Sequence, residues 1–445
     1  MKKITFIYPA IGKKKGQKYI KTWKMEPLPV ATLAAQVPDD IDIEFFDDRL
    51  ELINYNTNTD LVAINVETYT AQRAYYIANK FRERKIPVVL GGYHPSHMYE
   101  ESINHADTVV VGCSEEVFPS VIEDCRQNKL QKKYAGKPVF LPNLPRRDIF
   151  KGKKYLDLGL VETGRGCPHT CEFCHITTFY NAKYYPRPVE EIIKDILQSG
   201  KKRFFFVDDN LVANPTHAIA LFKELSKYNI TWAGQGTLTM AKNPELLKWM
   251  KKSGCIMMLI GFESLELANL KQIQKEWSSR LGDTCELVSR IHDAGIGIYA
   301  TFIFGFDHDT KETFEKTLAF AQKSKFFYAA FNHLLPFPGT PHYQQLVDQK
   351  RIIKPLWWLE EGYQYGEVVF EPAQMSPMEL SQNCFNARKE FFSFSSIAKR
   401  GLAQLKRNSN LSDFLLFLIS NANLKEEVYG KYGLPVGKGL DELPK

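Results

Sequence analysis

Two successive series of short apolar runs, each interrupted by helical segments, limit what this chain can fold into. In residues 1–130 the apolar runs fall at 4–9, 41–47, 61–66, 87–92 and 108–112, with helical patterns at 29–37, 70–85 and 117–127. Alternating strands and helices predict a parallel sheet with helices on both faces. We therefore expect a Rossmann-like, doubly wound α/β domain over 1–130, with any ligand beyond the carboxyl ends of its strands.

A second series begins near residue 158, after a proline-containing, basic segment at 131–157 that we interpret as a linker. Its strand patterns lie at 158–164, 203–209, 230–236, 255–263, 296–305 and 327–335, and helical patterns lie between them at 189–199, 244–253 and 313–324. Six strand–helix units are too few for a closed eightfold barrel. Residues 158–345 are therefore expected to form a partial, open (β/α)6 barrel, with catalytic groups where strands end.

Residues 346–445 differ in character, and we expect a small helical C-terminal extension there. Its aromatic residues include Trp357, Trp358, Phe391, Phe392 and Phe394. We interpret these rings as the packing core of the extension. The alternative is that they shape an apolar pocket for a lipid, a polyketide or a tetrapyrrole.

Composition and charge exclude several classes of protein. The 445 residues are 44% hydrophobic and 24% charged, as in globular proteins, and the eight cysteines do not form a secreted disulfide framework. The N-terminus lacks a signal-peptide cleavage site, and the apolar run 414–419 is shorter than the ~20 residues that cross a bilayer. We expect a cytoplasmic protein, with peripheral membrane contact left open. The net charge of +7 is interpreted as solvated surface charge.

Three cysteines stand within eight residues, in GRGCPHTCEFCHI, directly after the first strand of the second series. Thiolates at this C-x3-C-x2-C spacing can converge on one metal centre. A four-iron cluster normally takes four cysteines, so Cys167, Cys171 and Cys174 would leave one iron open to a small molecule. A zinc ion would take a fourth ligand, which His169 or His175 offers. Spacing alone leaves both metals open.

The cysteine pattern, with Phe173 just before the last cysteine, resembles the radical S-adenosylmethionine superfamily. In that family the three cysteines hold a [4Fe–4S] cluster, whose open iron chelates the amino and carboxylate groups of S-adenosylmethionine. An electron from the cluster splits the sulfonium and yields a 5′-deoxyadenosyl radical. The resemblance covers about residues 155–345, because segments at the ends of later strands also match.

Those later segments supply the candidate contacts to S-adenosylmethionine. The candidates are Asp208, Asp209, Asn210, Gln235, Glu263 and Ser264. The first three, in FFFVDDN, occupy the place of the family's contact to the methionine amino group, with helix capping as the alternative. Gln235 ends the third strand, and GFES at the end of the fourth offers groups for the methionine or the ribose. GIGIYATFIFGFDHDT and PFPGTP resemble the family's fifth strand and the loop after its sixth.

Residues 1–130 resemble the cobalamin-binding domain that precedes many radical S-adenosylmethionine enzymes. The resemblance rests on EPLPVATLAAQV, FFDDR, VVLGGYHPS and VVVGCSEEVFPS. It assigns to the corrin site Gly91, Gly92, Tyr93, His94, Pro95 and Glu115. Residues 1–150 lack the D-x-H-x-x-G motif that supplies a cobalt-ligating histidine, so the lower axial ligand is in doubt. His94 as cobalt ligand, pocket wall or turn cap remains open, as does a degenerate domain without cobalamin.

With both cofactors, the resemblance implies C-methylation of an unactivated carbon in a small-molecule or lipid-like substrate. The radical would abstract a hydrogen, and methylcobalamin would deliver the methyl group. It also implies an electron donor such as flavodoxin or ferredoxin, and no nucleic acid. Ring formation or rearrangement by the same cofactors, without net methyl transfer, is the first alternative. A zinc-binding interaction protein is the alternative from a different class.

Overall fold

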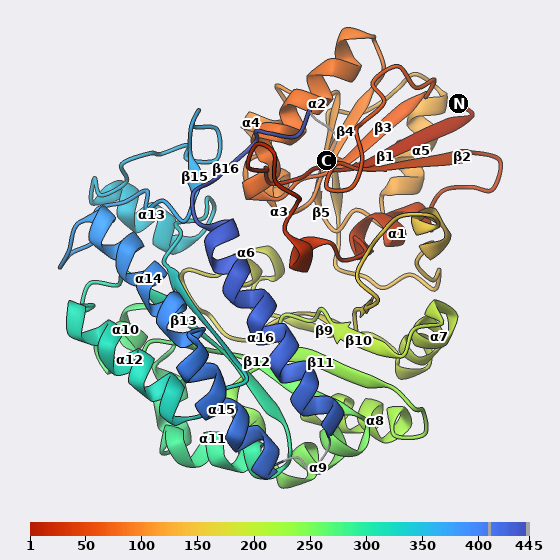
Figure 1. Ribbon diagram of the computed structural model, residues 1–445. Helices are drawn as coiled ribbons and strands as arrows, with labels where there is room; N and C mark the ends of the chain where they lie inside the picture. The colour runs from red at the N-terminus through yellow and green to blue at the C-terminus, as the bar shows by residue number, and fades with distance from the viewer. Residues whose placement is uncertain (408–410, 442–445) are drawn as a thin grey trace.

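The computed structural model describes residues 1–407 and 411–441, and its first sheet follows the N-terminal pattern. Six parallel strands lie in the order β2-β1-β3-β4-β5-β6. They are β1 (Lys3–Tyr8), β2 (Asp42–Asp47), β3 (Leu61–Asn65), β4 (Val88–Gly91), β5 (Thr108–Gly112) and β6 (Lys133–Gly136). The intervening helices are α1 (Leu28–Ala34), α2 (Ala71–Glu83), α3 (Tyr93–His97), α4 (Tyr99–Ser102) and α5 (Phe118–Arg126). Figure 1 shows this sheet at the upper right.

Both faces of the first sheet are covered, because successive residues of a strand point to opposite sides. Ile4 and Phe6 of β1 pack in one apolar cluster with the buried residues of α1 and α5. Ile7 of the same strand packs in a second cluster with those of α2. The doubly wound architecture expected from the sequence is therefore confirmed.

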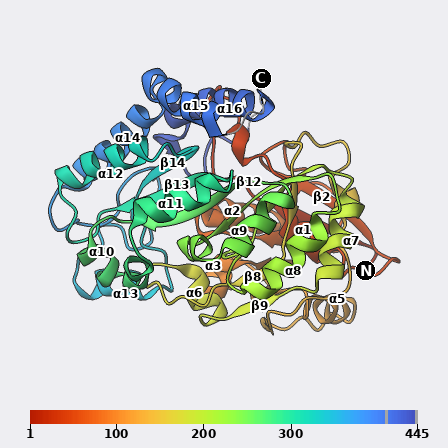
Figure 2. The same cartoon turned by 90° about the horizontal axis from the view of Figure 1, so that it is seen from below.

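The second sheet is an open barrel of six parallel strands in the order β14-β13-β12-β11-β10-β7. The strands are β7 (Gly159–Val161), β10 (Arg203–Phe206), β11 (Thr231–Gly236), β12 (Cys255–Glu263), β13 (Gly297–Phe304) and β14 (Tyr328–His333). Its helices are α7 (Val189–Ser199), α8 (Pro215–Leu225), α9 (Pro244–Lys252), α10 (Leu267–Gln272), α11 (Thr284–Asp293), α12 (Lys311–Lys323) and α13 (Pro341–Asp348). Figure 2 shows α8, α9 and α11 along its outer side. The partial (β/α)6 barrel is confirmed.

The segment 131–157 is more ordered than the linker that its composition indicates. Strand β6 pairs in parallel with β5, from Val109 opposite Lys133 to Gly112 opposite Gly136. Residues Arg147–Phe150 form a short 3-10 helix, and Phe150 is buried against Phe45 of β2. The sequence KYAG does not show the apolar pattern of a buried strand. A short, half-exposed strand at the edge of a sheet does not need that pattern. The domain boundary at residue 130 stays a prediction.

The C-terminal residues form three helices and a return to the first domain. The helices are α14 (Pro377–Phe391), α15 (Phe394–Arg407) and α16 (Leu411–Lys431). β15 (Gln364–Tyr365), which precedes them, pairs with β16 (Leu434–Pro435), which follows them. The residues that follow β16 then lie along the N-terminal domain: the N–H of Gly437 donates to the carbonyl of Ile11 at 2.7 Å. Arg73 of α2 also pairs with Asp441 at 2.9 Å. Figure 1 shows α16 leading from the barrel to this contact.

The aromatic residues of this region do not build a separate core, which corrects the sequence interpretation. Trp357 and Trp358 are buried in the apolar cluster of α2 and the first sheet. Phe391 and Phe392 are buried in the barrel core, whereas Phe394 is 72% exposed. Because the two Trp rings join the core of the first domain and Phe391 and Phe392 join that of the barrel, the extension connects the two domains.

Replacing Trp357 tests this connection. Trp357→Ala removes a fully buried ring whose Nε1 donates to the carbonyl of Pro336 at 2.9 Å, and should cost about 3–5 kcal/mol. The matched control Phe394→Ala removes an exposed ring and should cost about 1 kcal/mol or less. Urea unfolding of both variants measures the difference. Equal midpoints would show that the Trp357 contact is not stabilising.

Candidate functional site

The three cysteines lie on the loop that follows the first barrel strand. β8 (Gly164–Gly166), paired with β9 (Tyr184–Pro186), leads into Cys167, and Cys174 is the N-cap of α6 (His175–Tyr180). Gly166 has φ +81°, and a Cβ there would lie 2.2 Å from the carbonyl of Lys183. Burial raises the pKa of all three thiols, that of Cys171 to about 12. A bound metal therefore has to displace their protons.

The two histidines that could complete a zinc site beside these thiols pack against aromatic rings instead. Among the described residues, no three His, Cys, Asp or Glu side chains are grouped closely enough to hold one metal ion. A tetrahedral zinc with bonds of about 2.3 Å would need its sulfurs about 3.8 Å apart. The ring of His169 stacks on Trp277 at 3.8 Å, and His175 packs against Phe337 at 4.4 Å. A four-iron cluster binds each thiolate on a different iron and needs no histidine.

The three polar residues after β10 lie beside the cysteine loop but differ in the hydrogen bonds that their side chains already make. Asp208 accepts from the N–H and the hydroxyl of Thr163 at 3.0 and 2.6 Å, and burial raises its pKa to about 8. Asp209 accepts from the N–H of Gly166 at 2.9 Å. Asn210 contacts the Cys167 sulfur at 3.6 Å through Nδ2, while its buried Oδ1 has no hydrogen-bond partner. Asn210 Oδ1 is therefore a buried oxygen beside the cysteines that a ligand could use.

Gln235 and Ser264 are held by their own neighbours. Gln235 donates through Nε2 to the carbonyl of Asp209 at 3.2 Å, which ties the ends of β10 and β11 together. The Ser264 hydroxyl accepts from the N–H of Glu266 and from Asn269, both at 3.1 Å. Both residues lie at strand ends, as the sequence predicted, and their bonds position the loops around the site.

Glu263 forms a buried ion pair that the sequence motif did not indicate. Its Oε1 accepts from Lys275 Nζ at 2.7 Å, and both side chains are at most 10% exposed. Glu263 has φ +61°, and its carboxylate folds over Gly261, where a Cβ would lie only 2.1 Å from Oε1. Lys275 also acts electrostatically on Cys171 and Cys174. It was missed because it lies in a turn twelve residues after Glu263, without a motif around it.

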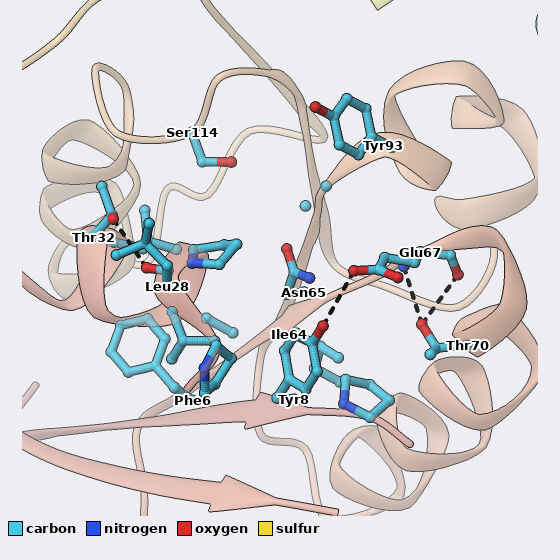
Figure 3. Close-up of a pocket in the computed structure, with 18 of the residues that line it drawn as sticks. Phe6, Tyr8, Leu28, Thr32, Ile64, Asn65, Glu67, Thr70, Tyr93 and Ser114 are labelled. Carbon is cyan, nitrogen blue, oxygen red and sulfur yellow. Dashed lines mark hydrogen bonds between the residues drawn. The ribbon is translucent and has the colours of Figure 1, made fainter. Parts of the chain in front are cut away.

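A cavity of about 570 Å³ lies at the carboxyl edge of the first sheet and reaches the barrel loop. In Figure 3, Thr32 and Ser114 lie on one side of its open centre, Glu67 and Thr70 on the other, and Asn65 between them. Its walls are largely apolar or aromatic, and they also include residues of β7, β8 and α6. This is where a parallel sheet binds ligands.

Four of the six residues assigned to the corrin site line this cavity: Gly91, Gly92, Tyr93 and Glu115. Gly92 has φ +116°, and a Cβ would lie 2.6 Å from the carbonyl of Val66. These glycines keep the wall flat, which suits a planar macrocycle. The chemistry of the lining therefore fits a corrin ring.

His94 and Pro95 are not among the described residues that line the cavity. His94 is 1% exposed, and its Nε2 lies 3.1 Å from the Tyr75 hydroxyl and 3.0 Å from Glu101 Oε1. Its ring also packs against Trp358. The structure therefore places His94 in the packing between α2 and the C-terminal segment. No described lining residue is a histidine.

Glu115 contributes to the cavity wall through an ion pair with the barrel. Arg165 Nη2 donates to Glu115 Oε1 at 2.6 Å and to Glu162 Oε2 at 2.9 Å. Arg165 is 6% exposed and stands two residues before Cys167. The loop after β5 is thereby tied to the strand that carries the cysteines.

Comparison with known proteins supports what this geometry indicates. The Radical SAM superfamily model matches residues 161–321. Bacteriochlorophyllide d C-12(1)-methyltransferase from Chlorobaculum tepidum is 30% identical over 391 residues and covers 83% of each chain. The chain belongs to the cobalamin-dependent radical S-adenosylmethionine methyltransferase family. A second relative in that organism, the bacteriochlorophyllide d C-8(2)-methyltransferase, is 26% identical over 88% of this chain and 90% of its own.

Solved structures share the fold of this chain along nearly its whole length. TsrM from Kitasatospora setae, solved with cobalamin and a [4Fe–4S] cluster, has a TM-score of 0.67 at 14% identity, covering 89% of this chain and 90% of its own. OxsB, solved with aqua-cobalamin and S-adenosylmethionine, has a TM-score of 0.69 at 15% identity, covering 96% and 72%. Family membership implies a [4Fe–4S] cluster, S-adenosylmethionine and cobalamin as cofactors, and excludes the zinc-binding alternative.

Replacing one cysteine tests the cluster site. Cys171→Ala should abolish bound iron and sulfide after anaerobic reconstitution, because the two remaining thiolates are too few to hold the cluster. Cys285→Ala, at an exposed cysteine outside the loop, is the control and should keep the full content. Iron retained in Cys171→Ala would contradict this assignment.

A double-mutant cycle tests the buried pair of Glu263 and Lys275. Lys275→Met leaves a buried carboxylate without its partner and should destabilise the apoprotein by about 3–5 kcal/mol. Adding Glu263→Gln removes that charge and should recover most of the loss. Urea unfolding of the wild type, both single variants and the double variant gives the interaction free energy of the pair. A loss that is not recovered in the double variant would show that Lys275 stabilises the fold by other contacts.

Proposed function

We propose that the enzyme is a radical C-methyltransferase that acts on an unactivated carbon of a small, largely apolar substrate. The observation that carries the proposal is the position of α6. This helix starts at Cys174, and its last residues, Phe179 and Tyr180, line the cavity assigned to cobalamin. The candidate cluster and the candidate corrin are thus the neighbours of one short helix.

When bound, the cluster with S-adenosylmethionine supplies a hydrogen-abstracting 5′-deoxyadenosyl radical, and cobalamin supplies the methyl group. The chain's own residues bind, orient and exclude water. Cys167, Cys171 and Cys174 would hold the cluster. Asn210 Oδ1 offers an acceptor for the methionine ammonium group, and the pair of Glu263 and Lys275 offers both charges to its amino-acid end.

The glycine loop after β4 would receive the corrin. Gly91 and Gly92 allow close backbone approach, and the hydroxyl of Ser114 faces the cavity as a polar contact. No described lining residue is a histidine, so this wall would hold cobalamin without a histidine side chain. The chain's net charge of +7 suits an acidic electron donor of the flavodoxin or ferredoxin type.

For the substrate we favour a chlorin-type tetrapyrrole. Two relatives that match most of this chain are named for methylation of bacteriochlorophyllide d. A hopanoid C-2 methylase from Rhodopseudomonas palustris, 26% identical over 74% of this chain, is named for another large apolar molecule. Ring formation remains the second candidate. A relative named anaerobic magnesium-protoporphyrin IX monomethyl ester cyclase is 25% identical over 74% of this chain.

Isotope transfer tests the proposal. Anaerobically reconstituted enzyme with cobalamin, a reductant, bacteriochlorophyllide d and S-adenosylmethionine labelled at its methyl group should yield a chlorin heavier by one labelled methyl group. 5′-Deoxyadenosine and S-adenosylhomocysteine should form in equal amounts, because one cofactor molecule starts the radical and another supplies the methyl group. A modified chlorin without label would support ring chemistry and contradict methyl transfer.

A further inference from the structure

The concave face of the barrel is the more accessible face of its strands. Along β11 to β14, fully buried residues alternate with residues that are half-buried or exposed. The buried set, such as Trp232, Ile260 and Phe302, belongs to the core beneath the outer helices. The other set, including Tyr299 and Asn332, therefore faces the interior of the barrel.

Arg388 reaches the rim of this interior from α14. That helix packs against β14, the edge strand of the barrel. Arg388 Nε donates to the carbonyl of Phe331 in β14 at 2.8 Å, which holds the guanidinium at the strand edge. Next to Phe331 in the chain is Asn332, an exposed residue of the interior face. Arg388 itself is half-buried.

No carboxylate of the described residues forms a salt bridge with Arg388. The positive charge acts on Tyr69, Tyr299 and Tyr365, and on His333. Burial lowers the pKa of His333 to about 3, so that ring is neutral. Glu427, which also acts on Tyr299, is paired with Lys431 at 3.0 Å.

The fully buried arginines of the described chain, unlike the half-buried Arg388, have their charges or donors satisfied. Arg49, Arg73, Arg165 and Arg187 pair with Asp or Glu at 2.6–2.9 Å. Arg400 donates to three backbone carbonyls and to Asn421. Arg388 uses one of its five N–H donors in this way, so its two outer nitrogens remain for a ligand.

Aromatic rings connect Arg388 to the cobalamin cavity. Tyr365 lies within the reach of its charge and contacts Trp23 at 5.5 Å and Tyr69 at 5.3 Å between ring centroids. Trp23, and Thr70 beside Tyr69, line that cavity. The guanidinium therefore stands between the cavity and the barrel interior, where a substrate would meet both cofactors.

We propose that Arg388 binds a carboxylate of the substrate and so determines which part of a large apolar molecule faces the cofactors. This inference rests on the proposed function and deepens it by naming the anionic group. A guanidinium matches a carboxylate with two parallel hydrogen bonds. The surrounding tyrosines suit an apolar ligand that carries one such anion, whereas a phosphate-rich ligand would need several cations or a helix N-terminus.

Equilibrium binding to the reconstituted full-length enzyme tests the role of Arg388. The probes are bacteriochlorophyllide d with its free propionate and the same chlorin as the propionate methyl ester, titrated in the presence of S-adenosylhomocysteine. The wild type should bind the acid at least tenfold more tightly than the ester. Arg388→Met should raise the Kd of the acid about 10- to 100-fold and leave that of the ester within about twofold. Arg388→Lys should give a Kd for the acid between these values, because lysine keeps the positive charge but cannot form the two parallel hydrogen bonds of a guanidinium.

Lys389→Met is the matched control, because it removes the same charge from an exposed neighbour on the same helix. It should bind both probes as the wild type does, and iron and cobalamin contents verify that each variant is folded. Equal binding of acid and ester by the wild type, or an unchanged preference in Arg388→Met, would overturn the proposal. Equal affinity for the acid and the ester, with labelled methyl transferred to both, would contradict the Arg388 assignment and leave the proposed methyl transfer standing. Acid-selective binding without label transfer would defeat methyl transfer alone.

Discussion

The buried guanidinium of Arg165 is the constraint on which the functional region depends. It is 6% exposed, so its charge has to be compensated by nearby acceptors. Those acceptors come from separate segments: Glu115 after β5, the carbonyl of Val139 after β6, and Glu162 after β7. Because one side chain satisfies all of them, the carboxyl edge of the first sheet and the cysteine loop are held face to face.

The remaining structure stabilises that juxtaposition. α6 connects the cysteine loop to the cavity wall, and its residue Phe179 packs against Tyr93 of the glycine loop at 4.7 Å. On the far side, Trp357 and Trp358 join the core of the first domain, and the chain end hydrogen-bonds to the loop after β1. Two domains that each have their own core are thus linked on both sides of the cavity.

The electrostatics of the site agree with radical rather than acid–base chemistry. The shifted carboxyl pKa values belong to groups with structural partners: Asp208 is bound by Thr163, and Asp209 by Gly166. Burial is the first cause of both shifts. Carboxyl groups with raised pKa values occur in this site because the site is enclosed. What the protein supplies is position, a largely apolar cavity and fixed charges beside the cysteines.

The sequence by itself determined the two sheets, their helices, the three cysteines and the glycine loop, because hydrophobic period and motif spacing are local properties. It identified residues at the correct strand ends, including Asn210, Glu263 and Glu115. Only the tertiary structure decided what each contacts: His94 packs against Trp358, and Glu115 pairs with Arg165. Lys275 and Arg388 have no motif, and they reach the site because distant segments pack together. Partners in three dimensions follow from packing and charge compensation, which spacing along the chain does not encode.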